Sequence, residues 1–421
     1  MDKFIIRGGK KLSGEVSVSG AKNASLALMP ASLLASGIST LYNTPQLNDV
    51  YTMMKLLKEL GVKTKFENDA LELNTQNITS QTAPYEHVKK MRASVYVLGP
   101  LVSRFGYAKV SLPGGCAWGP RPINLHLEAL KKMGAEIDLA EGYIIAKTKR
   151  LLGAKINFDV SSVGATGNTL MAASLAKGTT VINNAAIEPE ITNLADFLIK
   201  MGAKIEGIGT STLTIEGVET LKAAEINTIA DRIEAGTLLI AAAITKGKIT
   251  LKGISDFYIN SILARLEDSG CKIEINNDNI FLKSSDDFIK ATDVTSSIFP
   301  GFPTDMQAQW TAYMSIADGV SRVTDSIYLD RFKHVPELLR LGADIQVNEN
   351  TAVIKGVSKL NGAKVMSTDL RASASLVLAG LAAEGTTEVL RVYHLDRGYQ
   401  KIEEKLKSLG ADIERVAGAE Y

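Results

Sequence analysis

Residues 406–413 read LKSLGADI, and this segment decides the fold because close variants of it recur along the chain. The others are LLKELGVKT at 56–64, LKKMGAEI at 130–137, LIKMGAKI at 198–205, LEDSGCKI at 266–273 and LRLGADI at 339–345. Their glycines, Gly61, Gly134, Gly202, Gly270, Gly342 and Gly410, are spaced by 73, 68, 68, 72 and 68 residues. A steady period over the whole chain indicates six copies of one supersecondary unit of about 70 residues.

Each copy has two helices of different character. The first is built almost entirely from Ala, Leu, Ser and Met, as in KNASLALMPASLLASG from Lys22 and DLRASASLVLAGLAAEG from Asp369. A helix that is apolar on all sides is normally buried on all sides. The second is amphipathic, with Ile402, Leu406 and Leu409 on one face, and it ends at the motif glycine. Short strands follow each helix, so the period predicts a repeated α+β unit of the βαβαββ type.

The number of repeats sets the expected domain organisation. Six buried helices in one shell would enclose too large a core, so we expect two domains of three repeats each. The boundary is expected near residue 229, which gives one domain over 22–229 and another over 1–21 plus 230–421. We expect the strand Phe4–Ile6, which precedes the first repeat, to pair with the last repeat and make the second domain discontinuous.

The composition is that of an ordinary globular protein, with 47 Lys+Arg against 46 Asp+Glu. The net charge of +1 argues against nucleic acid as a partner, because nucleic-acid binding normally relies on a basic excess. Two distant cysteines and four scattered histidines give no support for a metal site. The first residues lack an apolar signal segment, and the apolar runs are too short to span a membrane. We therefore expect a cytoplasmic protein that is a monomer or a weak oligomer.

The residues that open the buried helices are charged or polar. They are Lys22-Asn23, Arg92, Gly164-Ala165-Thr166, Asp231-Arg232, Thr304-Asp305 and Asp369-Leu370-Arg371. A helix N-terminus presents backbone N–H groups and a positive partial charge, which suits an anion. Simple capping is the alternative for Asp231, Thr304 and Asp369. Capping does not explain Lys22, Arg92 or Arg371, because a cation at this end opposes the helix dipole.

A second set of residues follows the first strand of several repeats, namely Cys116 and Arg121, Arg331, and Asp396-Arg397. If the three helix N-termini of each domain point one way, both sets converge on a cleft between the domains. A basic cleft in a chain that is neutral overall favours a small phosphate-bearing metabolite over a polymer.

The loop LPGGCAWGPRP at 112–122 is the most distinctive local feature. Its glycines permit close backbone approach, its prolines fix the ends, and Arg121 would lower the pKa of an exposed Cys116 thiol. An incidental loop thiol is the alternative. Cys271 takes the place of Ala135 and Ala203 in the repeat motif, so we expect it in the core.

With these features together, the chain resembles the enolpyruvyl transferases that act on UDP-N-acetylglucosamine. The segments that carry the resemblance span nearly the whole chain: SGAKNA from Ser19, RASVYVLGPLVSRFG from Arg92, PGGCAWGPRP from Pro113, SVGAT from Ser162, EPEI from Glu188, DRIEAGT from Asp231, FPTDMQAQ from Phe302, DLRASASLVLAGL from Asp369 and HLDRGY from His394. The resemblance implies two inside-out α/β barrels of three repeats each, with the active site in the cleft between them.

The implied reaction joins phosphoenolpyruvate to the 3′-hydroxyl of UDP-N-acetylglucosamine and releases phosphate, through a tetrahedral intermediate and without a metal or organic cofactor. This is the first committed step of bacterial peptidoglycan synthesis. By resemblance, Lys22, Arg121 and Arg397 hold the phosphate of phosphoenolpyruvate, Arg331 and Arg371 lie near its carboxylate, and Asn23 contacts the substrates. Asp305 is the implied base. Cys116 is the implied proton donor, the residue that forms a phospholactoyl adduct and the target of fosfomycin.

The resemblance further implies a nucleotide-sugar site made by Asn23, Arg92, Arg121, Pro122, Ile123, Asn124, Leu125, Ser162, Val163, Gly164, Asp305 and Ile327, with Asp369 in support. Two alternatives stay open. A synthase of 5-enolpyruvylshikimate 3-phosphate shares the expected fold, but that family typically has Ser-Lys-Ser where this chain has Ala21-Lys22-Asn23, and it lacks the cysteine loop. A non-catalytic nucleotide-sugar-binding paralogue is the second alternative, since a fold alone does not establish activity.

Overall fold

The computed structural model describes residues 2–89, 91–112, 123–285 and 287–418. The chain divides into two compact units, each described by itself: a first unit, Gly20–Ile229, and a second unit, Met1–Ser19 with Ala230–Tyr421. Ala21 belongs with the first unit because its amide donates to the Ile229 carbonyl at 2.7 Å. In the described ranges, none of the helices combines the length and the apolar character needed to cross a membrane.

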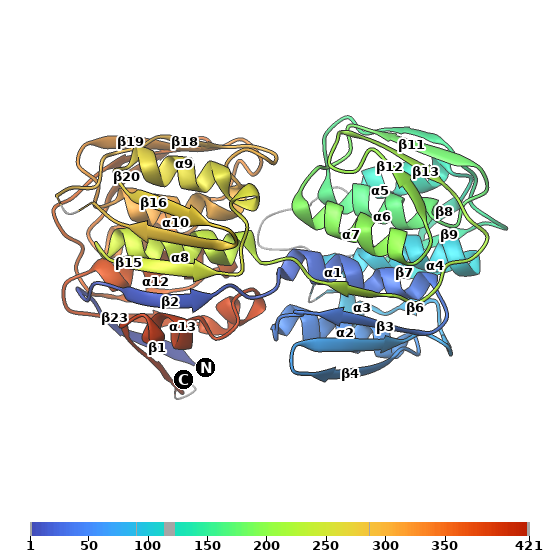
Figure 1. Ribbon diagram of the computed structural model, residues 1–421, viewed down its shortest axis with the longest axis horizontal. Helices are drawn as coiled ribbons and strands as arrows, with labels where there is room; N and C mark the ends of the chain where they lie inside the picture. The colour runs from blue at the N-terminus through green and yellow to red at the C-terminus, as the bar shows by residue number, and fades with distance from the viewer. Residues whose placement is uncertain (1, 90, 113–122, 286, 419–421) are drawn as a thin grey trace. The chain divides into compact units, whose positions relative to one another are not determined.

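The first unit contains three four-stranded sheets (Figure 1). In sheet order their strands are β14 (Glu225–Asn227), β3 (Ile38–Tyr42), β5 (Ala70–Asn74) and β4 (Lys63–Glu67); β6 (Thr82–Ala83), β7 (Tyr107–Ser111), β9 (Tyr143–Lys147) and β8 (Glu136–Ala140); and β10 (Lys155–Asn157), β11 (Thr179–Asn183), β13 (Thr212–Glu216) and β12 (Lys204–Glu206). The helices are α1 (Lys22–Ala31), η1 (Ser32–Leu34), α2 (Asn48–Glu59), α3 (Tyr85–Val88), η2 (Arg92–Val97), α4 (Leu98–Phe105), α5 (Asn124–Lys132), α6 (Val163–Ala173) and α7 (Pro189–Lys200).

The second unit repeats this plan. Its sheets are β2 (Ser13–Ser17), β15 (Lys248–Lys252), β17 (Asn279–Lys283) and β16 (Lys272–Asn276); β18 (Val294–Ser296), β19 (Val320–Asp325), β21 (Thr351–Lys355) and β20 (Asp344–Asn348); and β22 (Lys364–Met366), β23 (Thr386–Leu390), β1 (Lys3–Arg7) and β24 (Asp412–Val416). The helices are α8 (Arg232–Ile244), η3 (Asp256–Tyr258), α9 (Asn260–Asp268), η4 (Thr304–Met306), α10 (Gln307–Met314), α11 (Val335–Arg340), α12 (Leu370–Ala382), η5 (Val392–Arg397) and α13 (Ile402–Ser408).

All these sheets share one pairing pattern. The first two strands are parallel, and the last two continue the sheet in antiparallel pairing, as in β10, β11, β13 and β12. Where the two parallel strands follow one another in the chain, a buried helix joins them, as α6 joins β10 and β11. Parallel neighbours need such a crossover, which explains why these repeats carry an apolar helix between their first two strands. The repeated order confirms the βαβαββ unit that the sequence period predicts.

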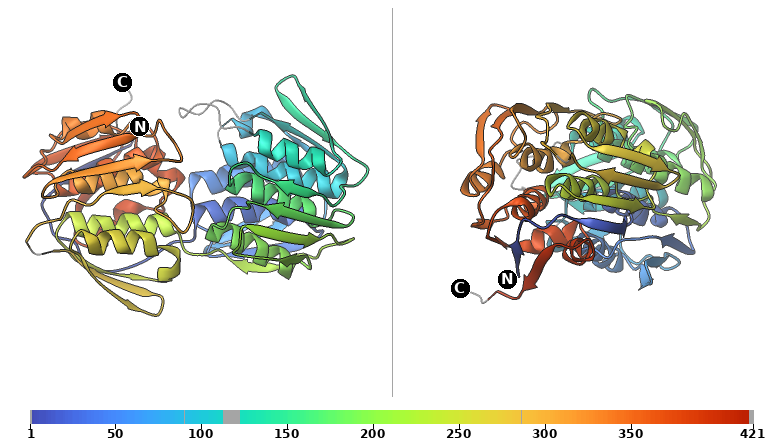
Figure 2. Two further views of the ribbon diagram at one scale, coloured as in Figure 1. Left: turned by 90° about the horizontal axis from the view of Figure 1, so that it is seen from above. Right: turned by 60° about the vertical axis from the view of Figure 1, so that its left-hand side comes forward.

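Strands from distant parts of the chain complete the sheets at the ends of each unit. β14 supplies the first strand of the α1 repeat, and β2 supplies the first strand of the α8 repeat. β1 lies between β23 and β24, antiparallel to both, so the N-terminal strand completes the last repeat (Figure 2). The expected pairing of Phe4–Ile6 with the last repeat is therefore confirmed.

The motif glycines end the amphipathic helices. All six have φ between 88° and 108°, a region that favours glycine. After each glycine, the next amide donates to the carbonyl five residues earlier at 2.9–3.2 Å, as from Val62 to Leu57 and from Ala411 to Leu406. This is the Schellman arrangement, which satisfies carbonyls left over at the helix end.

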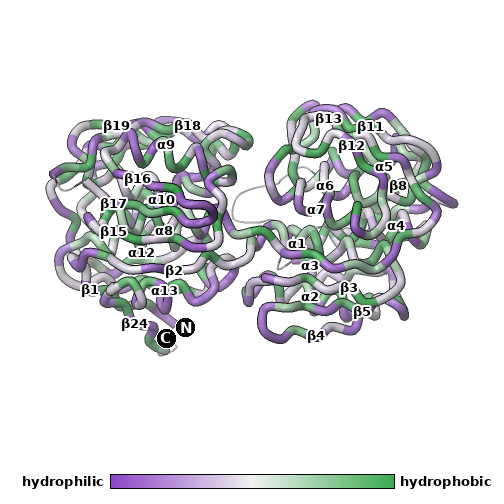
Figure 3. The backbone as a smooth tube through the Cα atoms, viewed as in Figure 1, coloured by the Kyte–Doolittle hydropathy of each residue, from purple (hydrophilic) through white to green (hydrophobic). Residues whose placement is uncertain are grey.

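The apolar helices form the interior of each unit. Every residue of α6 from Ala165 to Ala173 is buried, and so is every residue of α8 from Ile233 to Ile244. α8, α10 and α12 contact one another, and in the first unit α4 contacts α6. Figure 3 shows hydrophobic colouring along α8 and α12. In each unit these helices lie inside and the sheets lie outside. The first N–H groups of a helix have no partner within the helix, so the N-termini of these helices offer free backbone donors.

Candidate active site

The described residues that the sequence singled out lie at helix starts or in the loops that follow the second strand of a repeat. In the first unit, Lys22 and Asn23 open α1, Arg92 opens η2, Ile123, Asn124 and Leu125 begin α5, and Ser162, Val163 and Gly164 begin α6. In the second unit, Asp305 lies in η4, Asp369 and Arg371 begin α12, Ile327 and Arg331 follow β19, and Arg397 ends η5. Cys116, Arg121 and Pro122 lie outside the described residues.

Asp305, Arg331 and Arg371 come together from the start of η4, the loop after β19 and the start of α12. Arg331 Nη2 lies 2.7 Å from Asp305 Oδ1, and Arg371 Nη2 lies 2.6 Å from Asp305 Oδ2. The two arginine side chains are 9% and 8% exposed, whereas the Asp305 side chain is 25% exposed. The cluster thus carries two guanidinium charges against one carboxylate, and solvent reaches it through the carboxylate.

This arrangement fixes the protonation state of Asp305. Burial alone would raise the pKa of this carboxyl, but the Arg371 and Arg331 guanidiniums outweigh burial and hold the pKa well below its usual range. In this state Asp305 is a charged hydrogen-bond acceptor and a weak base. It becomes more basic only when another anion takes over one of its guanidinium partners.

Thr304 does not cap a helix, so the capping alternative is wrong for this residue. Pro303 occupies the N-cap position of η4, and no side chain there accepts an N-cap hydrogen bond. The Thr304 hydroxyl instead donates to Asp325 Oδ2 at 2.6 Å and accepts from Arg331 Nη1 at 2.8 Å. Thr304 therefore orients Arg331 beside Asp305.

Asp325 is a residue that the sequence analysis missed. Its Oδ1 accepts from the Ser296 hydroxyl at 2.6 Å and from the amides of Ile327 and Tyr328 at 3.0 and 2.9 Å. These bonds fold the loop that carries Ile327 and Arg331. The signal was present as an aspartate at a strand end followed by serine, a pattern typical of an Asx turn.

Asp231 and Asp369 cap helices, as the alternative given in the sequence analysis predicts for them. Asp231 Oδ1 accepts from the amides of Ile233 and Glu234 at the start of α8, at 2.8 and 3.0 Å. Asp369 Oδ1 accepts from Arg371 and Ala372 at the start of α12, at 2.9 and 3.1 Å. The second cap fixes the backbone of Arg371 itself, so Asp369 supports the cluster through the main chain.

The first unit places Lys22 in a buried ion pair. Lys22 Nζ lies 2.8 Å from Asp49 Oδ2, with side chains 12% and 5% exposed. Asp49 lies in the first turn of α2, and the sequence analysis missed it. The sequence analysis also did not predict the role of Tyr96. Its hydroxyl donates a hydrogen bond to the Val163 carbonyl at 3.3 Å and so supports the start of α6.

Cys271 is buried in the core of the second unit, as predicted, next to Ser269 and Tyr313. Burial raises the pKa of its thiol, which keeps it protonated and unreactive. In the described part of the chain, no group of three or more His, Cys, Asp or Glu side chains is arranged to hold a metal ion.

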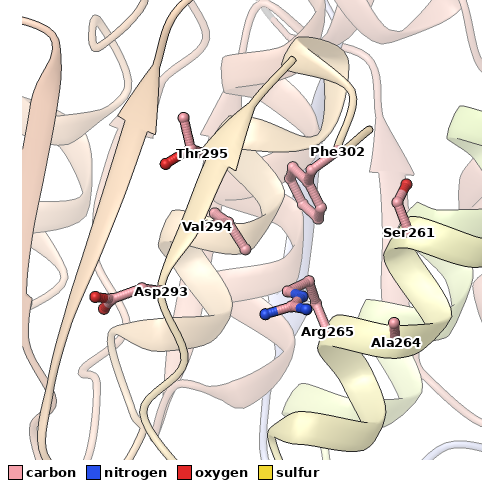
Figure 4. A pocket seen from close by; sticks show the side chains of 7 residues that line it. All are labelled: Ser261, Ala264, Arg265, Asp293, Val294, Thr295 and Phe302. Atoms are coloured by element: carbon pink, nitrogen blue, oxygen red, sulfur yellow. The ribbon is translucent and has the colours of Figure 1, made fainter. Parts of the chain in front are cut away.

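Two cavities lie away from the predicted site residues. One of about 230 Å³ is lined by Ser261, Ala264, Arg265, Asp293, Val294, Thr295 and Phe302 (Figure 4). The other, of about 400 Å³, is in the first unit and includes Arg104, Arg150 and Glu219. Arg104 there donates to the Leu33 and Ala35 carbonyls, both at 2.8 Å, and so closes a helix end. The residues of the Asp305 cluster line neither cavity.

The fold has counterparts in known proteins. A family model described as EPSP synthase (3-phosphoshikimate 1-carboxyvinyltransferase) matches residues 6–406. The enolpyruvyl transferase NikO from Streptomyces tendae superimposes with a TM-score of 0.89 at 25% identity, covering 99% of each chain. EPSP synthase from Acinetobacter baumannii superimposes with a TM-score of 0.76 at 17% identity, which shows the shared fold. The chain is thus of the carboxyvinyl transferase class.

Sequence relatives narrow this class. A UDP-N-acetylglucosamine 1-carboxyvinyltransferase from Chloroherpeton thalassium is 59% identical over all of this chain and 99% of its own. One from Chlorobium luteolum is 57% identical over the full length of both. The chain belongs to the UDP-N-acetylglucosamine 1-carboxyvinyltransferase family, a family of enzymes.

Proposed function

We propose that this chain transfers the enolpyruvyl group of phosphoenolpyruvate to the 3′-hydroxyl of UDP-N-acetylglucosamine and releases inorganic phosphate. The bond from C2 of the donor to its phosphate oxygen breaks, a bond from C2 to the 3′-oxygen forms, and the hydroxyl proton is lost. The observation that carries the proposal is the Asp305 carboxylate held between Arg331 and Arg371. The full-length identity to relatives of that name supports the choice of substrates.

The basic residues suit the charges of phosphoenolpyruvate. Arg331 and Arg371 would receive its carboxylate, while Lys22, Arg121 and Arg397 would hold its phosphate. Fixed cations at both ends let positive charge develop on the central carbon without repulsion between the two anionic groups. Two arginines share the Asp305 carboxylate, so an incoming anion would find two guanidinium groups already oriented side by side.

Asp305 would accept the 3′-hydroxyl proton. Its low pKa in the free protein makes it a poor base, but the substrate carboxylate competes for the same two guanidiniums. Loss of either partner would raise the pKa of Asp305 at the moment when the donor is bound. Base strength would thus depend on donor occupancy.

The remaining predicted residues would bind UDP-N-acetylglucosamine or donate a proton to phosphoenolpyruvate. The nucleotide-sugar site would be lined by Asn23, Arg92, Arg121, Pro122, Ile123, Asn124, Leu125, Ser162, Val163, Gly164, Asp305 and Ile327.

Cys116 would protonate the donor and form the phospholactoyl adduct. A Cys116→Asp variant should retain turnover, because a carboxylic acid can also donate a proton, and should escape alkylation by fosfomycin. Peptide mass spectrometry checks this, and alkylation at Cys271 would contradict it.

The decisive assay mixes the purified chain with phosphoenolpyruvate and UDP-N-acetylglucosamine and measures phosphate. Phosphate release that requires the nucleotide sugar is expected. Absence of such release would remove the proposal in favour of a non-catalytic binding protein. Release with shikimate 3-phosphate in place of the nucleotide sugar would favour the reaction named in the matched family model.

A further inference from the structure

The Tyr399 hydroxyl lies inside the second unit at a point where three buried helices meet. The residue is 2% exposed. Its hydroxyl lies 3.0 Å from Thr237 Oγ1 of α8, 3.2 Å from Gln309 Nε2 of α10 and 3.2 Å from Arg371 Nη1 of α12. A single oxygen therefore connects all three central helices of this unit.

The directions of these bonds follow from the donors available. The Thr237 hydroxyl donates to the Ile233 carbonyl at 2.7 Å, so its oxygen is left to accept from Tyr399. Gln309 Nε2 and Arg371 Nη1 are donors, and Tyr399 accepts from both. One donated and two accepted bonds are the full capacity of a phenolic hydroxyl. The pKa of Tyr399 is raised by burial, which keeps the proton needed for the bond to Thr237.

The same bonds lead directly to the Asp305 cluster. Arg371 donates Nη1 to Tyr399 and Nη2 to Asp305, and because a guanidinium is planar, fixing one nitrogen fixes the other. Gln309 Nε2 also donates to the Asp305 main-chain carbonyl at 3.0 Å. Tyr399 thus bonds to Arg371, which donates to the Asp305 side chain, and to Gln309, which donates to the Asp305 main chain.

We propose that Tyr399 is a positioning residue for enolpyruvyl transfer, whose hydroxyl holds the Arg371 guanidinium in the orientation that receives the donor carboxylate. The inference rests on the proposed function and adds to it a residue with no expected substrate contact. Tyr399 also lies two residues after Arg397, so its buried ring anchors the segment that carries a second substrate cation.

A packing role alone does not explain the hydroxyl. A phenylalanine would fill the same space without burying a polar group, which is costly unless every hydrogen bond is made. Tyr313 provides a matched comparison within the same unit. It is fully buried on α10, and its hydroxyl bonds to Ser269 at 2.9 Å and lies 3.6 Å from Cys271 Sγ. Its bonds lead to the core and not to the cluster.

The test compares Tyr399→Phe with Tyr313→Phe in steady-state kinetics. Tyr399→Phe should lower kcat/KM for phosphoenolpyruvate about 10- to 100-fold, the range for one lost hydrogen bond to a charged group. KM for UDP-N-acetylglucosamine should stay unchanged, and Tyr313→Phe should have wild-type kinetics. In an Arg371→Lys background, Tyr399→Phe should have little further effect, because the hydroxyl acts through the guanidinium. Equal effects of the two tyrosine variants, or full additivity with Arg371→Lys, would overturn the inference.

A second measurement separates this inference from the proposed function. If the wild-type chain shows no turnover, the function is wrong, but the Tyr399–Arg371 coupling can still be read from urea unfolding of Tyr399→Phe, Arg371→Met and the double variant. Non-additive shifts of the unfolding midpoint would support the contact as the means by which Arg371 is held. Additive shifts would overturn it.

Discussion

The two units build the same repeat but differ in the acidic residues at the starts of their central helices. In the second unit, Asp231 caps α8, Asp369 caps α12, and Asp305 lies in the first turn of η4. In the first unit, α1 and η2 begin with Lys22 and Arg92, and among the described residues no side chain caps either helix. Carboxylates complement the positive end of a helix dipole, whereas cations add to it. The repeat therefore sets the frame, and the helix openings make the two units chemically different.

The buried ion pairs of the two units also differ in how their carboxylates are shared. In the first unit, Lys22 Nζ lies against the buried carboxylate of Asp49. In the second unit, Arg331 and Arg371 share the Asp305 carboxylate. We infer that Asp49 stabilises the fold and holds Lys22 in place for the donor phosphate, and that the second cluster is prepared to exchange its carboxylate for that of a substrate.

The strongest test of this difference is Asp305→Asn. The amide keeps the shape of the side chain but can neither carry the charge nor accept a proton. We expect kcat to fall by about 10²- to 10⁴-fold, the usual contribution of a positioned general base. The unfolding free energy should fall by about 2–3 kcal/mol, less than for a fully buried pair because Asp305 is 25% exposed. Phosphate-release kinetics and urea unfolding measure the two effects.

Asp49→Asn is the matched variant in the first unit. It removes the charged partner 2.8 Å from the Lys22 ammonium in a site where both side chains are nearly buried, so we expect a larger loss of unfolding free energy, about 3–5 kcal/mol. The loss in kcat should be under about tenfold, since Asp49 has no proposed role in proton transfer. If the two variants lost kcat equally, the distinction between a structural pair and a reactive cluster would be wrong.

The sequence predicted the repeat architecture of the two units better than the side-chain contacts within them. A glycine motif with a steady period implies a repeated helix end, and the six left-handed glycines confirm it. Such a signal is local and is repeated six times. The partners of Lys22 and of Arg331 come from α2 and from η4, and their approach depends on how neighbouring elements pack. Packing leaves no periodic trace, which explains why Asp49, Asp325 and Tyr399 were missed.

Buried histidines offer a second test, because each unit has one beside its predicted site residues. Burial lowers the pKa of His334 to about 3, with Arg331 adding to the effect, and burial lowers the pKa of His126 to about 4. An unfolded histidine binds a proton below about pH 6.5, whereas these remain neutral while folded. The stability they contribute is fully present above about pH 6.5 and is lost as the pH falls toward 4.

Urea unfolding between pH 7 and 5 should show this dependence. Each histidine should contribute up to about 1.4 kcal/mol per pH unit to the slope, so His334→Gln and His126→Gln should each flatten it, and the double variant should flatten it most. His126 Nδ1 lies 3.0 Å from Asn168 Nδ2, whereas His334 Nε2 is buried without a hydrogen-bond partner in the described structure. Replacement of His126 should therefore cost more stability at pH 7. A slope that neither substitution changes would contradict this.

The smallest effects are expected from substitutions of the helix caps. The two aspartate variants should have similar losses of unfolding free energy but different effects on activity. Asp231→Ala and Asp369→Ala each remove an oxygen that accepts two amides, so each should lower the unfolding free energy by about 1–2 kcal/mol. Ser162→Ala in the first unit removes a single bond of 3.3 Å and should cost about 0.5 kcal/mol.

Activity should divide the two aspartates even though their caps are alike. One amide that Asp369 accepts is that of Arg371, so losing this cap lets the guanidinium shift relative to Asp305. Asp231 accepts amides from Ile233 and Glu234, so its cap does not hold the Arg371 main chain, although its charge helps to raise the pKa of Arg371. We therefore expect Asp369→Ala to raise KM for phosphoenolpyruvate several-fold and Asp231→Ala to raise it less. Equal KM values at equal losses of stability would mean that the α12 cap serves the fold alone and that Tyr399 and Asp305 suffice to place Arg371.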